Sequence, residues 1–146
     1  SGFGFEIRRF VEASRDCEAP PLLLFDEFAR TTSSQEAEAI LSAVLEAMAA
    51  KPGVLAIFST HFRGVQRLPG VSYLRMKGLN RNGLNLDLAS ETALAERIRL
   101  IDQRMEYHLV ADTRDAEVSD AIAVAGLLGL DPRITRRASE YFRNER

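Results

Sequence analysis

The sequence predicts an α/β fold in which helices flank a mostly parallel sheet. Two short apolar runs, Leu22–Phe25 and residues 54–58, are continuously hydrophobic, which is typical of strands buried on both faces. Between them, apolar residues recur at every third or fourth position over residues 37–48, as on one face of a helix. A strand, a helix and a second strand in this order indicate a right-handed parallel crossover.

Two helices are expected in the amino-terminal half. Residues 4–14 carry an apolar stripe among charged side chains, and this spacing predicts the first helix. The helix of residues 37–48 begins at a capping box, in which Ser33 and Glu36 satisfy each other's free backbone N–H groups. The sequence Lys-Pro-Gly at residues 51–53 ends that helix.

The carboxyl-terminal half alternates strand and helix signals. We expect, in chain order, an edge strand at 71–76, a turn at 80–83, a helix at 90–103 capped by Ser90, a strand at 105–110 and a helix at 118–128. A last helix begins after Asp131, which serves as N-cap, with Pro132 at its first position. No internal repeat or linker interrupts the pattern, so we expect one domain.

Composition excludes several classes of protein. The chain has 146 residues, 46% of them hydrophobic and 27% charged, which suits one globular domain and not a disordered or coiled-coil protein. Its net charge of -2 provides no general attraction to nucleic acid or to acidic membranes. The single cysteine excludes an intrachain disulfide, so a reducing cytoplasm is expected. No apolar run reaches the ~20 residues that a membrane-spanning helix needs.

An acid pair follows the first predicted strand directly. A buried strand that ends in Asp-Glu has the Walker B form of nucleoside triphosphatases. In that arrangement Asp26 would hold a magnesium ion through water, and Glu27 would orient the attacking water. Four apolar residues before two acids also occur by chance at many strand ends, so the pair alone favours a solvated terminus.

A histidine at the end of the second strand changes this balance. His61 follows residues 54–58, and parallel strands bring their carboxyl ends to one edge of a sheet, where open α/β sheets bind ligands. There His61 could hydrogen-bond the γ-phosphate or the water that Glu27 orients. The agreement between the two strands favours a catalytic site built from Asp26, Glu27 and His61.

The motifs, taken in order, resemble the carboxyl-terminal half of the ATPase domain of the MutS mismatch-repair family, which belongs to the ABC ATPase group. Residues 22–33 read LLLFDEFARTTS, where the family has LLLxDE followed by (I/L)GRGTS, and residues 59–62 read STHF, where it has ATH(Y/F). Residues 119–131 are a looser match to SYGxxVAxLAGxP, and residues 134–138 read ITRRA, where the family has IxRA. The opening Ser1-Gly2 is similar to the signature segment SGxSTFxxE, with Glu6 near its acid. Residues 80–104 have no clear counterpart.

The resemblance implies a dimeric ATPase that uses ATP and Mg²⁺. The signature segment of one subunit would meet the γ-phosphate held by the other, a role that falls by position to Ser1 and Gly2. The loop from Arg30 through Thr32 to Ser33 would cross the dimer seam. The acid pair and His61 would serve the subunit's own nucleotide.

The sequence also departs from the family. No G-x-x-x-x-G-K-[ST] motif is present, so we expect the Walker A half to precede Ser1 and the chain alone to bind ATP poorly. Thr31 stands where the family has glycine, which puts the backbone conformation of that loop in doubt because a β-branched residue resists positive φ. Asp120-Ala121 replaces a Tyr-Gly pair. These changes suggest a divergent member.

Three functions remain open at this point. The first is the ATPase part of a DNA mismatch-repair or recombination protein, acting as a homodimer or with a related ATPase subunit and contacting DNA through absent amino-terminal domains. The second is a MutS-like ATPase that reactivates a metabolic enzyme without DNA, and the third is a non-catalytic association module. No membrane partner is expected. The arginines of the last helix are explained by a solvated face, and His108 by a structural role in its strand.

Overall fold

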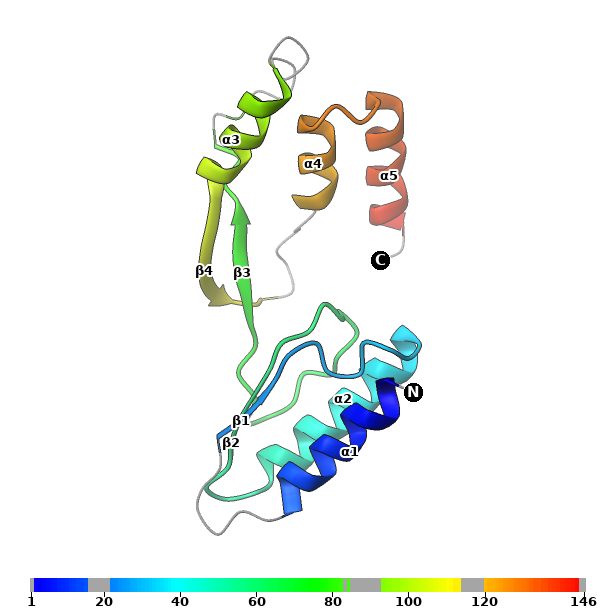
Figure 1. Ribbon diagram of the computed structural model, residues 1–146, viewed down its shortest axis with the longest axis vertical. Coiled ribbons are helices and arrows are strands. Elements are labelled where there is room, and N and C mark those ends of the chain that lie inside the picture. The colour runs from blue at the N-terminus through cyan, green and yellow to red at the C-terminus, as the bar shows by residue number, and fades with distance from the viewer. Residues whose placement is uncertain (1, 16–21, 83, 85–92, 114–119, 145–146) are drawn as a thin grey trace. The chain divides into compact units, whose positions relative to one another are not determined.

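The computed structural model describes residues 2–15, 22–82, 84, 93–113 and 120–144 (Figure 1). The chain divides into two compact units, Ser1–Val71 and Ser72–Arg146, each with its own two-stranded sheet. The elements are α1 (Gly2–Arg15), β1 (Leu22–Phe25), α2 (Ser34–Ala49) and β2 (Leu55–Phe58), then β3 (Leu74–Leu79), α3 (Leu94–Arg104), β4 (Met105–Ala111), α4 (Asp120–Leu127) and α5 (Pro132–Asn144). The mixed α/β class is confirmed. The P-loop NTPase fold and the membership of both units in one ATPase domain stay predictions.

The first sheet is the parallel pair that the strand-helix-strand pattern predicted. β1 and β2 pair in parallel, with Leu22 opposite Leu55 and Phe25 opposite Phe58. The backbone N–H of Ser59 donates to the carbonyl oxygen of Phe25 at 2.9 Å, which extends the pairing one residue beyond β2. Both strands therefore end at the same edge.

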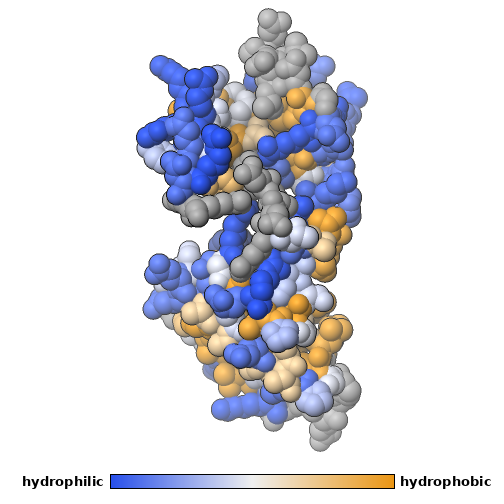
Figure 2. All heavy atoms as spheres, turned by 180° about the vertical axis from the view of Figure 1, so that it is seen from behind, coloured by the Kyte–Doolittle hydropathy of each residue, from blue (hydrophilic) through white to orange (hydrophobic). Residues whose placement is uncertain are grey.

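The two faces of this sheet differ, which corrects the expectation of strands buried on both faces. Leu23 is buried, and its neighbour Phe25 packs against Phe10 of α1, with ring centroids 5.5 Å apart. The aliphatic side chains of the opposite face are 56 to 65% exposed: Leu22, Leu24, Leu55 and Ile57. Burial on one face is the natural result for a pair of strands that α1 packs against from one side. Figure 2 shows hydrophobic atoms at the molecular surface among hydrophilic ones.

Four phenylalanines form the centre of the first unit. Phe28 is 2% exposed, and its ring centroid lies 5.7 Å from that of Phe10 and 5.8 Å from those of Phe25 and Phe58. The rings of Phe25 and Phe58 stack across the two strands at 4.9 Å. Helix α2 adds the buried side chains Ala37, Leu41 and Met48. The segment that follows Asp26 is thus held by an aromatic core.

The capping box at the start of α2 is confirmed. Ser33 is the N-cap, and its hydroxyl accepts from the backbone N–H of Glu36 at 3.4 Å. The Glu36 carboxylate accepts from the hydroxyls of Ser33 at 2.6 Å and Thr32 at 3.1 Å. These hydrogen bonds favour the charged carboxylate and lower the pKa of Glu36.

The second sheet is antiparallel, so the prediction of a mostly parallel sheet holds only for the first unit. β3 pairs with β4 from Leu74 opposite Ala111 to Leu79 opposite Met105, with an irregularity between Met76 and Gly78. The strand predicted at 71–76 is therefore placed too early. Its true position is set by the partner strand and not by the alternating pattern of residues 71–76.

Gly78 makes the irregularity possible. Its φ is +84°, and a Cβ at this position would collide with the Asp120 carboxylate. That carboxylate accepts from the backbone N–H of Leu79 at 2.9 Å and pairs with Arg81 at 3.2 Å. Asp120, which replaces the tyrosine of the MutS pattern, thus fastens the start of α4 to β3.

The helices of the second unit enclose a small core of Leu79, Ile101 and Leu127. α3 begins at Leu94 with Ala93 as N-cap, and the predicted cap Ser90 lies outside the described residues. α4 matches the helix predicted at 118–128, of which residues 118–119 are also outside them. α5 begins at Pro132 as predicted, and the Asp131 carboxylate accepts from the backbone N–H of Arg133 at 2.8 Å.

None of the helices formed by the described residues combines the length and the apolar character needed to cross a membrane.

Candidate functional site

The candidate site lies at the edge where β1 and β2 end. The acid pair leaves β1 at this edge, and residues 59–61 leave β2 beside it, because the strands are parallel and in register up to Phe25 and Phe58. The structure therefore brings together the two segments that sequence reasoning joined. All the predicted site residues that the structure describes belong to the first unit.

Ser59 links the two members of the acid pair. Its hydroxyl donates to Oδ1 of Asp26 and accepts from the backbone N–H of Glu27 at 3.0 Å. A serine hydroxyl has one donor and two acceptor lone pairs, so it can make both bonds at once. Asp26 itself is exposed.

The backbone after β1 makes a turn that ordinary residues resist. Glu27 has φ +49° and Ala29 has φ +63°, both in the left-handed region, where a non-glycine residue costs about 1–3 kcal/mol. The buried Ala29 donates its backbone N–H to Oε2 of Glu6 on α1 at 3.0 Å. Thr31 is not among the positive-φ residues of the described chain, so its β-branch does not conflict with the loop.

The side chains of the predicted seam loop make contacts inside their own chain. Arg30 Nη1 lies 2.5 Å from Oε2 of Glu27, and both side chains are partly exposed. The hydroxyls of Thr32 and Ser33 donate to the Glu36 carboxylate, as described above. A role for these residues across a dimer seam stays a prediction.

The amino end of α1 lies beside this loop. A Cβ built at Gly2 would lie 3.4 Å from Cγ2 of Thr31. The first helical residue therefore lies close to the loop, and its role as a signature segment stays a prediction. Ser1 lies outside the described residues.

His61 lies three residues beyond the end of β2 and is exposed. Its ring packs against Phe62, with centroids 4.4 Å apart and planes at 40°. The segment beyond it is fastened to α2, because Gly64 donates its backbone N–H to Oε1 of Glu38 at 2.8 Å and Gln66 donates to Oγ of Ser42 at 3.0 Å. The imidazole is thus carried on an anchored segment and faces solvent, while the contacts of the acid pair are with Ser59 and Arg30.

The oxygen atoms at this edge are of the kind that Mg²⁺ prefers. Asp26 offers an exposed carboxylate, whose oxygens are hard ligands. Within the described ranges no three His, Cys, Asp or Glu side chains converge as a metal group.

Sequence reasoning missed two polar residues that support the site. Ser59 was seen only as part of a motif, although its position one residue past the paired strands places it opposite the acid pair. Glu6 was noted as the acid of a signature segment, and the structure gives it a contact with Ala29. Each contact joins segments more than 20 residues apart, which local patterns do not reveal.

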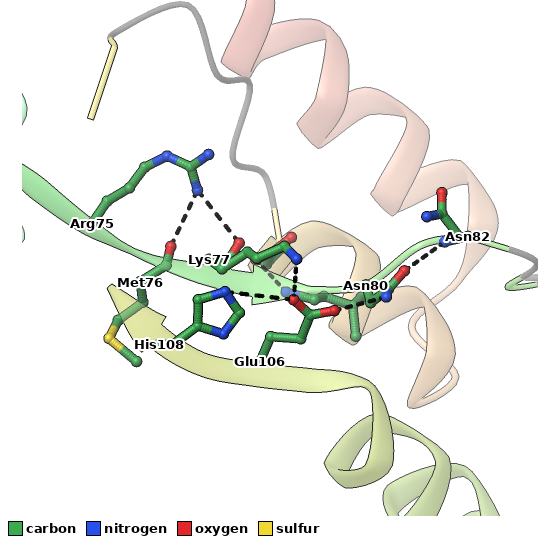
Figure 3. Close-up of polar contacts among 9 residues, drawn as sticks. Arg75, Met76, Lys77, Asn80, Asn82, Glu106 and His108 are labelled. Atoms are coloured by element: carbon green, nitrogen blue, oxygen red, sulfur yellow. Dashed lines mark hydrogen bonds and ion pairs between the residues drawn. The ribbon is translucent and has the colours of Figure 1, made fainter. Parts of the chain in front are cut away.

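A second polar cluster lies on the β3–β4 sheet (Figure 3). The Glu106 carboxylate forms an ion pair with Lys77 at 2.5 Å and accepts a hydrogen bond from Asn80 at 2.7 Å, and Nε2 of His108 lies 4.0 Å from it. These groups favour the charged form and lower the pKa of Glu106. The Glu106 carboxylate is thus paired with groups of its own sheet, and the structural role expected of His108 stays a prediction.

The arginines of α5 are partly neutralised by neighbours. Arg133 pairs with Asp131 at 2.7 Å, and Arg137 pairs with Glu140 at 2.6 Å while its guanidinium lies 4.5 Å from the centroid of the Tyr141 ring. Such pairing reduces the positive charge available to a phosphate backbone. The helix therefore has the character of a solvated face.

The comparisons with known proteins add no relatives. No family model, curated protein or solved structure matches the chain. The resemblance to MutS is therefore carried by the motifs of the sequence alone.

Proposed function

We propose that this chain is the ATP-hydrolysing part of a MutS-like protein that acts as a dimer. The observation that supports the proposal is the shared edge of β1 and β2, where Asp26 and Glu27 lie beside residues 59–61. Phosphoryl transfer needs little covalent chemistry from a protein, and depends on positioning and on stabilising charge. A strained turn that carries two carboxylates next to a histidine-bearing segment supplies positioning of this kind.

In this proposal each side chain has one task. Asp26 would hold Mg²⁺, which when bound would neutralise charge that develops on the phosphates. Glu27 accepts a hydrogen bond from the attacking water and orients it. The ion pair between Glu27 and Arg30 is half exposed and therefore weak, so a water molecule can compete for the carboxylate.

In this proposal, groups other than Asp26 and Glu27 make the remaining contacts with the nucleotide. The phosphate-binding loop would be supplied by sequence other than the 146 residues, and Gly2 of one subunit would approach the γ-phosphate held by the other, as the resemblance implies. The closeness of Gly2 to Thr31 supports this, because it places a signature-like helix start beside the seam loop. DNA mismatch repair or recombination is the proposed setting, and reactivation of a metabolic enzyme is the alternative.

The alternative setting has one observation in its favour. Two of the four arginines of α5, Arg133 and Arg137, pair with carboxylates, which reduces the positive charge that this helix offers to a phosphate backbone. An ATPase that works without DNA contact from this segment is consistent with that pairing. Stimulation of hydrolysis by mismatched duplex DNA would favour the mismatch-repair setting, and hydrolysis indifferent to DNA would favour the alternative.

ATP hydrolysis by the protein that contains this chain, compared with its His61→Ala variant, tests the proposal. We expect magnesium-dependent hydrolysis that the substitution slows by roughly tenfold to a hundredfold, less than loss of Glu27, because a hydrogen bond to phosphate or water is removed while the acid pair remains. The thermal midpoint should stay unchanged, since the ring is exposed. Absence of hydrolysis in the wild type would contradict the proposed function. A lower thermal midpoint with normal turnover in His61→Ala would contradict the catalytic role of His61.

A further inference from the structure

Ser59 occupies a special position relative to the acid pair. It is the first residue after β2, and its backbone N–H continues the parallel ladder by donating to Phe25 at 2.9 Å. This bond sets Ser59 directly beside the start of the Asp26–Glu27 turn. The backbone position of Ser59 is therefore fixed by the sheet and not by its own side chain.

The hydroxyl of Ser59 uses both its donor and its acceptor capacity on that turn. It donates to Oδ1 of Asp26 and accepts the backbone N–H of Glu27 at 3.0 Å. The first bond restricts the orientation of the Asp26 carboxylate. The second holds the backbone of a residue whose φ of +49° is unfavourable for glutamate.

The turn is thus held from two sides by side chains of distant segments. Ser59 binds the Glu27 N–H from β2, and Glu6 binds the Ala29 N–H from α1 at 3.0 Å. The two contacts differ in what they touch, because Glu6 supports only backbone at a buried residue whereas Ser59 also contacts the Asp26 carboxylate. Of the two, only Ser59 can affect both acids directly.

The matching motif of the MutS family has alanine at the position of Ser59. Alanine has no hydroxyl, so these two bonds are a property of this chain and not one carried over by the resemblance. The backbone hydrogen bond from Ser59 to Phe25 does not involve the side chain, so an alanine at this position would also make it. The role of the hydroxyl can therefore be separated from the role of the strand.

We propose that Ser59 is a positioning residue that orients the Asp26 carboxylate toward magnesium and holds the Glu27 backbone in its left-handed conformation. This inference rests on the proposed function. It assigns to Ser59 no contact with substrate. Its effect on turnover passes through the two acids.

The test compares Ser59→Ala and Ser59→Thr in the protein that contains this chain. Ser72→Ala serves as control, since Ser72 is an exposed serine of the other unit. Amide hydrogen exchange at Glu27 reports on the backbone bond, independently of activity. Steady-state hydrolysis gives kcat, the KM for ATP and the Mg²⁺ concentration at half-maximal rate.

We expect Ser59→Ala to speed exchange at the Glu27 amide, to lower kcat roughly tenfold or more and to raise the Mg²⁺ requirement, with the KM for ATP nearly unchanged. Ser59→Thr retains a hydroxyl, so its Glu27 amide exchange, kcat and Mg²⁺ requirement should be close to those of the wild type. Ser72→Ala should change none of these three quantities. Wild-type kcat and Mg²⁺ requirement in Ser59→Ala would overturn the inference. A loss of kcat that is accompanied by a lower thermal midpoint and that Ser59→Thr does not restore would also overturn it. Absence of hydrolysis in the wild type would instead overturn the proposed function and the inference with it.

Discussion

Replacing Glu27 by glutamine should leave ATP binding intact and reduce turnover by on the order of 10²- to 10⁴-fold, the range that general acid–base catalysis contributes. The amide keeps the size of the side chain but cannot accept a proton or orient water as a carboxylate does. Its backbone N–H can still donate to Ser59, and the lost ion pair with Arg30 is partly exposed, so the fold should be little affected. Nucleotide titration and steady-state hydrolysis in the protein that contains this chain measure the two effects separately.

Glu46→Gln is the matched control for this experiment. Glu46 is an exposed carboxylate on α2. The control should bind and hydrolyse ATP as the wild type does. Turnover in Glu27→Gln equal to that of the control would remove Glu27 from the catalytic machinery.

Replacing Phe28 by alanine should destabilise the protein by about 3–5 kcal/mol, as is usual when a buried phenylalanine is truncated. Phe28 is 2% exposed and packs within 5.8 Å of the rings of Phe10, Phe25 and Phe58. Removal of the ring leaves a cavity beneath the turn that carries the acid pair. Urea unfolding, followed by circular dichroism, measures the loss.

The chain offers a control for aromatic content. Phe5 is 61% exposed on α1, so Phe5→Ala should change the free energy of unfolding by no more than about 0.5 kcal/mol. Phe28→Leu fills most of the cavity and should fall between the two. A loss in Phe28→Ala as small as that of Phe5→Ala would show that the four rings do not form the core of this unit.

Patterns confined to a few neighbouring residues predicted much of the first unit. The apolar runs predicted β1 and β2, because a short continuous hydrophobic stretch bounded by polar residues is typical of a strand. The capping box gave the start of α2, because its hydrogen bonds join Ser33 and Glu36, three residues apart. The shared edge followed from parallel order alone.

Contacts between distant segments were not predictable in this way. Ser59 and Asp26 are 33 residues apart, and Glu6 and Ala29 are 23 apart. The left-handed conformations of Glu27 and Ala29 leave no sequence signal, since neither residue prefers them. The tertiary contacts that hold this turn are visible only in the structure.

The second unit shows the same limit in its strands. The alternation at residues 71–76 predicted a strand, but pairing with β4 moves it to Leu74–Leu79. Gly78 and Asp120, 42 positions apart, make that register possible through a close approach of a carboxylate to a residue without a side chain. A strand's existence follows from local pattern, whereas its ends depend on its partner.

The most direct test of the account is where a divalent ion binds when ATP is present. Mn²⁺ accepts the same oxygen ligands as Mg²⁺ and broadens the NMR signals of nearby nuclei. Added with ATP to the protein that contains this chain, it should broaden the amide signals of Asp26, Glu27 and Ser59 most strongly. Broadening centred on Glu106 in β4, or none at the edge of β1 and β2, would contradict an ATPase site at that edge.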